Sequence, residues 1–330
     1  MKRVLVLVNN LAQASFRLRI AALAPLLADR GFDLDIQLRP KGLLAAPKLW
    51  QLLKTAGQYH AVIIQRRFLA PLDAKVLRRH ARKIFYDVDD ALMFHNHPVG
   101  PVSRWKTQRH FRATAKILDH VAAGNEYLTD VFRRQGCQAS VIPTVVDAGR
   151  YQAKVHEPTA IPRLVWIGSH STLPYLRAFL PAIERAAADV PDLRLLTIAD
   201  ATIESDVISM EHEPWTETDE TAALCRGDIG LAPTPTDPWT MGKCGFKILQ
   251  YMAAGLPVIA SPVGANAQIV LEGETGFLPR ELGDWPSAIA RLATDVDLRT
   301  TMGAAARRRV ETQYSLARAA DLWAELLSTQ

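Results

Sequence analysis

Long apolar runs are missing from this sequence of 330 residues. No stretch approaches the roughly 20 consecutive apolar residues that a membrane-spanning helix needs. The apolar run near the start stops at Val8, which is too early for a secretory signal, and no small-residue cleavage site follows it. We interpret this run as a buried first strand and expect a cytoplasmic protein.

Cysteine is also scarce. Cys137, Cys225 and Cys244 are scattered along the chain and odd in number. They form neither a C-x-x-C pair nor a disulfide framework, which favours a reducing compartment. No nucleic-acid-binding motif is present. We expect no cofactor, no bound metal and no nucleic-acid partner.

The composition allows more than one hydrophobic core, because 48% of the residues are hydrophobic and 22% are charged. Two domains of roughly 150 residues each are therefore expected. The net charge of +5 and a pI near 9.1 favour attraction to an anion such as phosphate, acidic lipid or nucleic acid. The alternative is a basic soluble protein without such a partner.

Short apolar runs alternate with amphipathic segments in both halves of the chain. Strands are predicted at 3–8, 33–38, 61–65, 83–88 and 119–124, and again at 164–169, 194–199, 229–233 and 257–261. Helices are predicted at 16–31, 47–56, 71–82, 103–117 and 126–135, and again at 174–189, 217–226, 245–254, 285–294 and within 301–328. This alternation predicts α/β architecture with two parallel sheets covered by helices.

A polar stretch with two prolines, 151–163, interrupts the alternation and is predicted to be a linker. It separates a Rossmann-like domain at 1–150 from a second one at 164–312. Residues 313–330 are predicted to form a helix that crosses back to the first domain. Ligands of such folds bind at the carboxyl ends of the strands, so a cleft is expected there.

The stretch GKCGFKILQYMAAGLPVIASPVG, 242–264, places two lysines at the start of the predicted helix 245–254. Lys243, Lys247 and Gln250 fall on one helical stripe. Cations at a helix N-terminus oppose the helix dipole unless an anion binds the free N–H groups there. The pattern therefore predicts an anion site, and the alternative is a pair of solvated surface lysines.

The stretch WIGSHST, 166–172, forms the turn after the first strand of the second half. Its small and hydroxyl residues suit phosphate oxygens through backbone and side-chain donors. The residues concerned are Gly168, Ser169, Ser171 and Thr172. An ordinary Gly-Ser turn is the alternative.

Three carboxylates end a predicted buried strand in FYDVDDAL, 85–92. Strand alternation sends Asp87 and Asp89 to one side and Asp90 to the other. Three interpretations stay open: the carboxylates orient substrate hydroxyls, cap the next helix, or bind a metal as an Asp-x-Asp motif.

The segment FKILQYMAAGLPVIASPVGANAQIVLEGETGFL, 246–278, resembles the donor-binding segment of retaining glycosyltransferases with the GT-B fold, sequence family 4. The shared pattern is Met-Ala-x-Gly-x-Pro-Val-Ile-Ala followed by Gly-x-x-Gly-Phe. The resemblance implies two Rossmann-like domains that face each other across a cleft, with the donor site in the second domain.

The chain departs from that family at its two glutamates, which are separated by seven residues. The second glutamate, which holds the ribose hydroxyls, corresponds to Gln250, and the first corresponds to Gly242. Asp237 is then the nearest acid that reaches the donor sugar. The resemblance also places Asp89 at the family's active-site histidine and Asp90 at the acid after it.

The complete set of candidate residues falls into three groups. The candidate catalytic residues are Asp89, Asp90 and Asp237. The donor-binding candidates are Gly168, Ser169, Ser171, Thr172, Trp215, Lys243, Phe246, Lys247 and Gln250, with Trp215 at the nucleobase. The candidates on the acceptor or diphosphate side are Ser15, Arg17 and Arg19.

The resemblance implies a metal-independent retaining hexosyltransferase that uses a nucleoside-diphosphate sugar and a saccharide or lipid-linked acceptor. A role in cell-envelope polysaccharide or glycolipid synthesis is expected. The basic clusters 78–83 and 104–112 suggest peripheral contact with an anionic membrane at its inner face, or are solvated helix faces. A GT-B sugar-nucleotide epimerase and a non-catalytic partner subunit are the alternatives.

Overall fold

The computed structural model describes residues 1–40, 45–158 and 162–329. The chain divides into two compact units. The first unit contains residues 1–144, 237–244 and 316–330, and the second contains 145–236 and 245–315. The chain therefore passes from one unit to the other four times, where the sequence suggested a single linker and a returning tail.

The beginning of the predicted linker packs within the second unit. Tyr151 is 3% exposed, and the Lys154 N–H donates to the Ala254 carbonyl over 2.9 Å. The boundary observed after Thr144 thus comes earlier than the predicted boundary at residue 150. Residues 159–161 of the predicted linker lie outside the described residues.

The first unit contains a six-stranded parallel sheet with the order β2-β1-β3-β4-β5-β6. Its strands are β1 (Lys2–Val8), β2 (Phe32–Leu38), β3 (Ala61–Gln65), β4 (Ile84–Val88), β5 (His120–Ala123) and β6 (Ala139–Val141). The central strands β3 and β4 are buried along their whole length, which explains their continuous apolar runs. The α/β prediction is confirmed.

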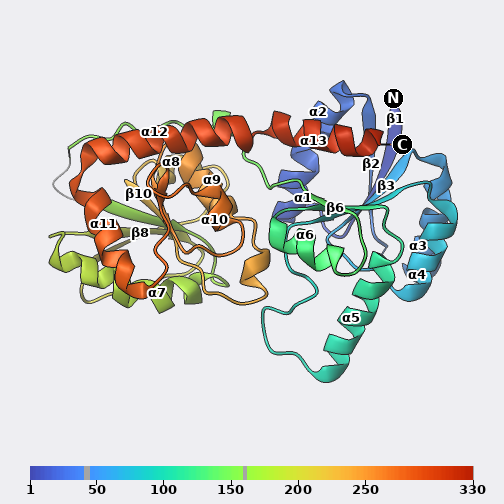
Figure 1. Cartoon of the computed structure of the whole chain (residues 1–330), viewed down its shortest axis with the longest axis horizontal. Coiled ribbons are helices and arrows are strands. Elements are labelled where there is room, and N and C mark those ends of the chain that lie inside the picture. The colour runs from blue at the N-terminus through green and yellow to red at the C-terminus, as the bar shows by residue number, and fades with distance from the viewer. Residues whose placement is uncertain (41–44, 159–161, 330) are drawn as a thin grey trace. The chain divides into compact units, whose positions relative to one another are not determined.

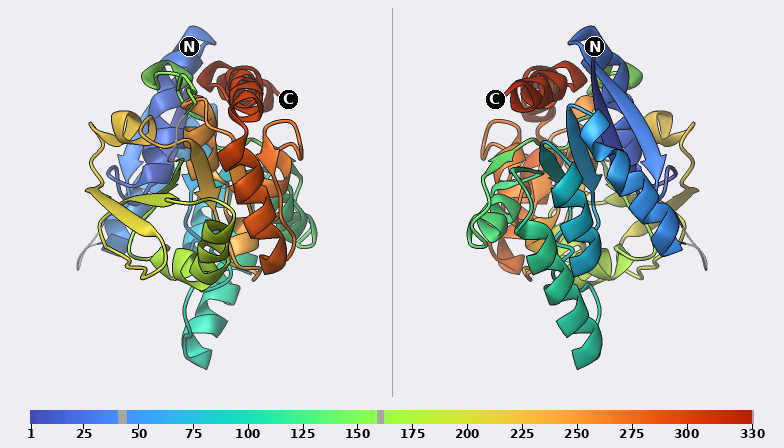
Figure 2. Two further views of the ribbon diagram at one scale, coloured as in Figure 1. Left: turned by 90° about the vertical axis from the view of Figure 1, so that its left-hand side faces the viewer. Right: turned by 90° about the vertical axis from the view of Figure 1, so that its right-hand side faces the viewer.

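Helices cover this sheet. They are α1 (Ala14–Arg19), α2 (Ala24–Asp29), α3 (Ala45–Lys54), α4 (Pro71–His80), α5 (Pro101–Ala115) and α6 (Glu126–Arg133). Helices α3, α4 and α5 lie side by side on one face (Figure 2), where Leu53, Leu77 and Phe111 enter one core. The single helix predicted at 16–31 is broken into α1, a 3₁₀ turn and α2, because Pro25 at the start of α2 ends the preceding helical turn.

The last helix, α13 (Leu316–Ser328), belongs to the first unit and lies beside α2 (Figure 1). Arg30 forms an ion pair with Asp321 at 2.6 Å, and the His60 ring is 2.9 Å from the Leu327 carbonyl. Trp323 and Leu327 are its buried anchors.

The second unit contains another six-stranded parallel sheet, with the order β12-β11-β10-β7-β8-β9. Its strands are β7 (Arg163–Ile167), β8 (Arg194–Ala199), β9 (Ser209–Pro214), β10 (Ile229–Ala232), β11 (Val258–Ala260) and β12 (Gly276–Phe277). Its helices are α7 (Leu173–Arg185), α8 (Glu220–Leu224), α9 (Phe246–Ala253), α10 (Asn266–Ile269), α11 (Trp285–Thr294) and α12 (Val296–Gln313).

The sequence did not predict three of the strands. β6 and β12 have only three and two residues, too few for a period to emerge. β9, with the sequence SMEHEP, is a polar strand at the edge of its sheet, and no residue in it is fully buried. Each of the three pairs with a neighbour that supplies the apolar core, so its own composition carries little signal.

In each sheet, the first strand of the unit marks the point where the strand order changes direction. β1 lies between β2 and β3, and β7 lies between β8 and β10. Loops that leave the carboxyl ends of strands on either side of such a point diverge, and they leave room for a ligand. The loops after β1, β3 and β4, and those after β7 and β10, are therefore the places to look for a site.

Candidate active site

The carboxylates after β4 have separate partners. Asp87, within β4, is fully buried and receives hydrogen bonds from Arg19 and Gln65. Asp89 and Asp90 lie beyond the strand end and both form ion pairs with Arg66, at 3.2 and 2.6 Å. The prediction that Asp89 and Asp90 point to opposite sides is wrong, because β4 ends at Val88 and alternation stops there.

Arg19 is a buried structural residue. Its side chain is 2% exposed, and its guanidinium lies 2.6 Å from Asp87 Oδ1 and donates to the Ile142 carbonyl over 2.8 Å. Burial alone lowers the pKa of Arg19, but the Asp87 carboxylate more than offsets this, so the net pKa is raised. The predicted role of Arg19 in reaching an anion does not fit this position. Arg17 is half-buried on the same helix.

Arg66 organises this part of the first unit, although the sequence analysis did not identify it. It follows β3 with φ of 51°, a left-handed conformation that costs energy for a residue with a Cβ. From there its guanidinium donates to the Ser15 hydroxyl and contacts both Asp89 and Asp90. The strained backbone thus aims one cation at the two predicted carboxylates.

Residues 237–244 bring a second cation to the same carboxylates. Lys243 Nζ is 3.1 Å from Asp90 Oδ1 and lies over the Trp239 ring, 4.8 Å from its centroid. Burial raises the pKa of Asp90, and Asp89 adds to the rise, whereas Lys243 and Arg66 oppose it. Two carboxylates and two cations therefore form one compact, charge-balanced cluster.

The backbone of this segment is held in place by side chains of the first unit. Asn125 donates to the carbonyls of Met241 and Lys243 over 3.1 and 2.9 Å. Gly242 lies so close to Ala91 that a Cβ there would come within 2.4 Å of the alanine methyl. A side chain at position 242 is therefore excluded, which gives a structural reason for the glycine where the resembling family has a glutamate.

Asp237 caps a turn. Its Oδ1 accepts hydrogen bonds from the backbone N–H groups of Trp239 and Thr240, over 2.8 and 2.9 Å. These bonds stabilise the 3₁₀ turn Thr240–Gly242 that precedes Lys243. The structure thus gives Asp237 a local role in positioning Lys243.

Lys243 and Lys247 do not share a helix face. Helix α9 begins only at Phe246, after Gly245 with φ of 66°, and Lys243 is extended. The predicted stripe of Lys243, Lys247 and Gln250 is therefore wrong, because the left-handed glycine separates Lys243 from the helix.

Lys247 lies in the first turn of α9, in the second unit. Its Nζ is 4.5 Å from the centroid of the Trp166 ring, and Trp166 belongs to β7. The contact places this cation beside the strand whose carboxyl end carries the loop 168–172. Within that loop, the Ser169 N–H donates to Thr172 Oγ1 over 3.1 Å, and the Ser169 and Ser171 hydroxyls are 2.8 Å apart.

A polar network connects two more candidates in the second unit. Gln250 Nε2 donates to the Tyr151 hydroxyl over 3.3 Å, and that hydroxyl donates to Glu220 Oε1 over 3.3 Å. Trp215 Nε1 donates to Glu220 Oε2 over 2.9 Å. Burial raises the pKa of Tyr151, and the neighbouring Glu220 adds to the rise. Gln250 and Trp215 are thus joined through two residues that sequence analysis missed.

Seven of the candidates fall into three groups. Ser15, Asp89, Asp90 and Lys243 gather around Arg66 in the first unit. Lys247 lies beside the β7 strand in the second unit, and Gln250 joins Trp215 there. Phe246 is half-buried at the start of α9.

No group of three or more His, Cys, Asp or Glu side chains in the described ranges has the arrangement of a metal site. None of the helices within those ranges combines the length and the hydrophobicity that crossing a bilayer requires.

Comparison with known sequences identifies a family for part of the chain. Residues 161–295 match the family described as "Glycosyl transferases group 1". Glycogen synthase of Mycobacterium tuberculosis is 22% identical over 255 residues, which cover 70% of this chain. The chain spans 60% of the length of that relative.

Comparison with solved structures identifies the fold. Sucrose-phosphate synthase from Thermosynechococcus elongatus superimposes with a TM-score of 0.71 at 16% identity, over 99% of this chain and 98% of that one. Alr3699/HepE of Anabaena, solved in complex with UDP-glucose, gives a TM-score of 0.71 at 15% identity over 100% of both chains. The fold is GT-B, as predicted.

Proposed function

We propose that this chain, a member of the glycosyl transferases group 1 family through residues 161–295, transfers a sugar from a nucleoside-diphosphate sugar to an acceptor hydroxyl with retention of configuration. The observation that carries the proposal is the position of Lys247 in the first turn of α9, against Trp166 of β7. The helix dipole disfavours a cation at this place, and an anion bound beside it offsets that effect. A diphosphate is an anion that suits both the lysine and the N-terminus of the helix.

The remaining donor contacts follow from the same region. The hydroxyls of Ser169, Ser171 and Thr172 supply further hydrogen bonds to phosphate oxygens at the carboxyl end of β7. Gln250 binds the ribose hydroxyls and Trp215 packs on the nucleobase. UDP-glucose is the first donor to test, because the Anabaena neighbour was solved with it.

In the proposed reaction, the bond between the anomeric carbon and the diphosphate oxygen breaks while the acceptor oxygen bonds to the same face of that carbon. The departing phosphate takes the acceptor proton. Lys247 offsets the negative charge that grows on the leaving group, a contribution of about 2–4 kcal/mol for a well-placed contact. Because the helix terminus and lysine supply the positive charge, no metal ion is required.

The carboxylates of the first unit serve the acceptor in this proposal. Asp89 and Asp90 accept hydrogen bonds from sugar hydroxyls, and ion pairs with Arg66 and Lys243 hold their carboxylates in place. Asp237 acts through Lys243, whose turn it caps. The acceptor is a saccharide or lipid-linked saccharide, and we place the enzyme in cell-envelope polysaccharide or glycolipid synthesis at the cytoplasmic face of an anionic membrane.

A screen of donors tests this proposal. Thermal unfolding of the full chain is followed with UDP, GDP, TDP and their sugars. A ligand at 100 times its dissociation constant adds about 2.7 kcal/mol of stability. The donor that binds is then incubated with candidate acceptors, and NMR of the product shows whether the anomeric configuration is retained. An inverted product would contradict the retaining mechanism.

A matched pair of variants locates the donor. Lys247→Ala removes the cation at α9, and Lys48→Ala removes an exposed lysine of α3. We expect only Lys247→Ala to lose the stabilisation by the nucleotide. Equal stabilisation of both variants would show that α9 is not the diphosphate site.

A further inference from the structure

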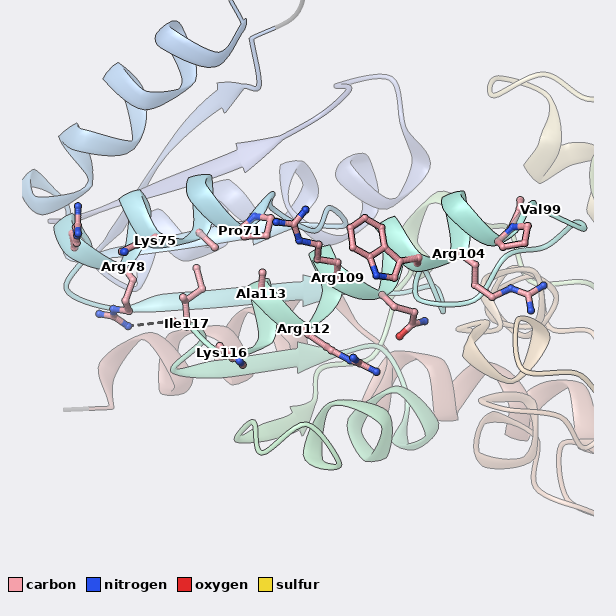
Figure 3. A pocket seen from close by; sticks show the side chains of 15 residues that line it. Pro71, Lys75, Arg78, Val99, Arg104, Arg109, Arg112, Ala113, Lys116 and Ile117 are labelled. Atoms are coloured by element: carbon pink, nitrogen blue, oxygen red, sulfur yellow. Dashed lines mark hydrogen bonds between the residues drawn. The ribbon is translucent and has the colours of Figure 1, made fainter.

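A basic groove of about 1030 Å³ lies between α4 and α5 of the first unit (Figure 3). The cations that line it come from both helices and the residue after the second: Lys75, Arg78 and Arg79 from α4, Arg104, Arg109 and Arg112 from α5, and Lys116 directly after α5. Among the described residues that line this groove, which we call the α4–α5 groove, none is an aspartate or glutamate. The positive charge of the groove is therefore concentrated and has little internal compensation.

One of these cations has a structural role. Arg78 forms an ion pair with Asp119 at 2.7 Å and donates to the carbonyls of Ile117, Ala81 and Arg82. The other six belong to the surface of the two helices. Burial, and then the charges of Lys106 and Arg109, lower the pKa of His110 on α5, which is a sign of the positive potential there.

Exposed apolar side chains lie in the groove and on the two helices that form it. Trp105 lines it and is 61% exposed, with Arg109 stacked on its ring at 5.3 Å from the centroid. Val102, on the same helix, is 78% exposed, and Leu72, at the start of α4, is 53% exposed. Large apolar side chains that stay in water next to a cationic surface indicate a partner with both apolar and anionic parts.

The first two turns of α5 have no side facing the core. Residues 101–106 are all exposed, and the buried residues of this helix, Phe111, Thr114 and Ala115, lie in its last two turns. The exposed turns carry Val102, Arg104 and Trp105. Aromatic and aliphatic residues interleaved with arginine on an exposed helix are typical of segments that lie in the headgroup region of a membrane.

We propose that the α4–α5 groove is the membrane-docking surface of this protein, and that its partner is a bilayer containing anionic phospholipids. The inference deepens the proposed function, since it names the site of the membrane contact that function includes. Charge complementarity selects the anionic headgroups, which the six surface cations face. The exposed tryptophan, valine and leucine favour a bilayer over a soluble polyanion, because these side chains gain free energy only when their apolar surface leaves water.

Vesicle binding tests the proposal. The full chain is sedimented with vesicles of phosphatidylcholine alone, and with vesicles of phosphatidylcholine and phosphatidylglycerol in equal parts. We expect binding to the mixed vesicles only. Arg104→Glu/Arg112→Glu reverses two cations of the groove, whereas Arg177→Glu/Arg308→Glu, the control, makes the same charge change at exposed helix positions of the second unit.

Each cation near an anionic surface contributes about a fivefold gain in partitioning, so the groove variant loses about 25-fold or more. The control variant keeps most of its binding. Equal losses in the two variants would show that net charge alone drives association and would overturn the proposal. An absence of binding by the unmodified chain would overturn it as well.

A second variant separates insertion from electrostatic attraction. Trp105→Phe keeps an aromatic ring and all the cations. With brominated phosphatidylcholine in the vesicles, we expect the unmodified chain to show quenched tryptophan fluorescence and Trp105→Phe to bind equally well but lose that quenching. Unchanged quenching in Trp105→Phe, or full displacement of the chain from vesicles by inorganic phosphate at the lipid phosphate concentration, would contradict docking of α5 in the bilayer.

The outcome is independent of the donor site. Nucleotide titration of the Arg104→Glu/Arg112→Glu variant shows whether donor binding is intact. A chain that binds vesicles through the α4–α5 groove but binds no nucleoside diphosphate would refute the proposed function and leave the docking surface standing. A chain that binds a nucleoside diphosphate but does not bind vesicles would refute the docking surface alone.

Discussion

Replacement of Arg19 by methionine tests the interpretation of Arg19 as a structural residue. The substitution keeps an unbranched apolar stem and removes the guanidinium that contacts Asp87 and the Ile142 carbonyl. Asp87, which is fully buried, then retains Gln65 as its hydrogen-bond donor within the described contacts. Removing one partner from a buried ion pair costs about 3–5 kcal/mol, because the other charge is left uncompensated.

A second argument gives the same magnitude. Burial already raises the pKa of Asp87, and loss of Arg19 removes the main opposing influence. The folded variant therefore holds Asp87 protonated, and protonating a carboxyl with an ordinary pKa near 3.9 costs about 4 kcal/mol at pH 7. At pH values between the unfolded pKa of Asp87 and its raised folded pKa, the folded state binds one more proton than the unfolded state.

The sign of the pH dependence follows from this extra proton. Stability of the variant falls as pH rises from the unfolded pKa of Asp87 towards its raised folded pKa. Relative to the unmodified chain, the cost of the substitution is thus smaller at pH 5 than at pH 7. Arg19→Met/Asp87→Asn removes the carboxyl and abolishes this slope.

Native-state hydrogen exchange in peptides covering β1 and β4 measures the opening free energy of the first unit by itself. The control is Arg30→Met, which removes the partly exposed pair with Asp321 and costs about 0.2–1 kcal/mol. If Arg19→Met costs no more than this control, or its cost is the same at pH 5 and pH 7, the structural role of Arg19 is refuted.

Three further predictions concern the proposed reaction. Lys247→Ala weakens binding of the nucleoside diphosphate by about 1.5–3 kcal/mol, since it removes a charge-assisted contact, and calorimetric titration beside Lys48→Ala checks this; equal affinities would contradict it. Gln250→Ala loses about 1–3 kcal/mol of nucleotide affinity. Gln250→Glu keeps its binding, because a carboxylate also accepts hydrogen bonds from the ribose hydroxyls. A variant with a lower melting temperature but normal nucleotide affinity would show that Gln250 only supports Tyr151. Arg66→Met lowers the transfer rate while donor affinity stays unchanged, because Asp89 and Asp90 lose the cation that holds them. Steady-state kinetics measures this loss, and Arg67→Met, at the exposed neighbouring residue, is the control. Equal transfer rates in the two variants would refute the role of Arg66.

The sequence predicted both sheets because their central strands are buried on two faces and leave continuous apolar runs. It missed Arg66 because the importance of that residue depends on β3 pairing between β1 and β4, which brings Arg66 to Ser15 and Asp90. Strand pairing over such sequence separations leaves no local pattern.

The lysine pair shows a different limit. Helical periodicity joins Lys243 to Lys247, but the positive φ of Gly245 and the Asp237 cap give residues 237–244 a conformation of their own. The network around Gln250 was hidden for a similar reason. Tyr151 and Glu220 are 69 residues apart in the chain and meet only in the folded second unit.

Calorimetric titration of the full chain with UDP-glucose, GDP-glucose and TDP-glucose, each with and without a chelator, tests the central claim most directly. We predict saturable binding of one of these donors, unchanged by the chelator and weakened in Lys247→Ala but not in Lys48→Ala. Absence of binding by every donor, or binding that Lys247→Ala leaves intact, would contradict the assignment of the donor site to α9 and β7.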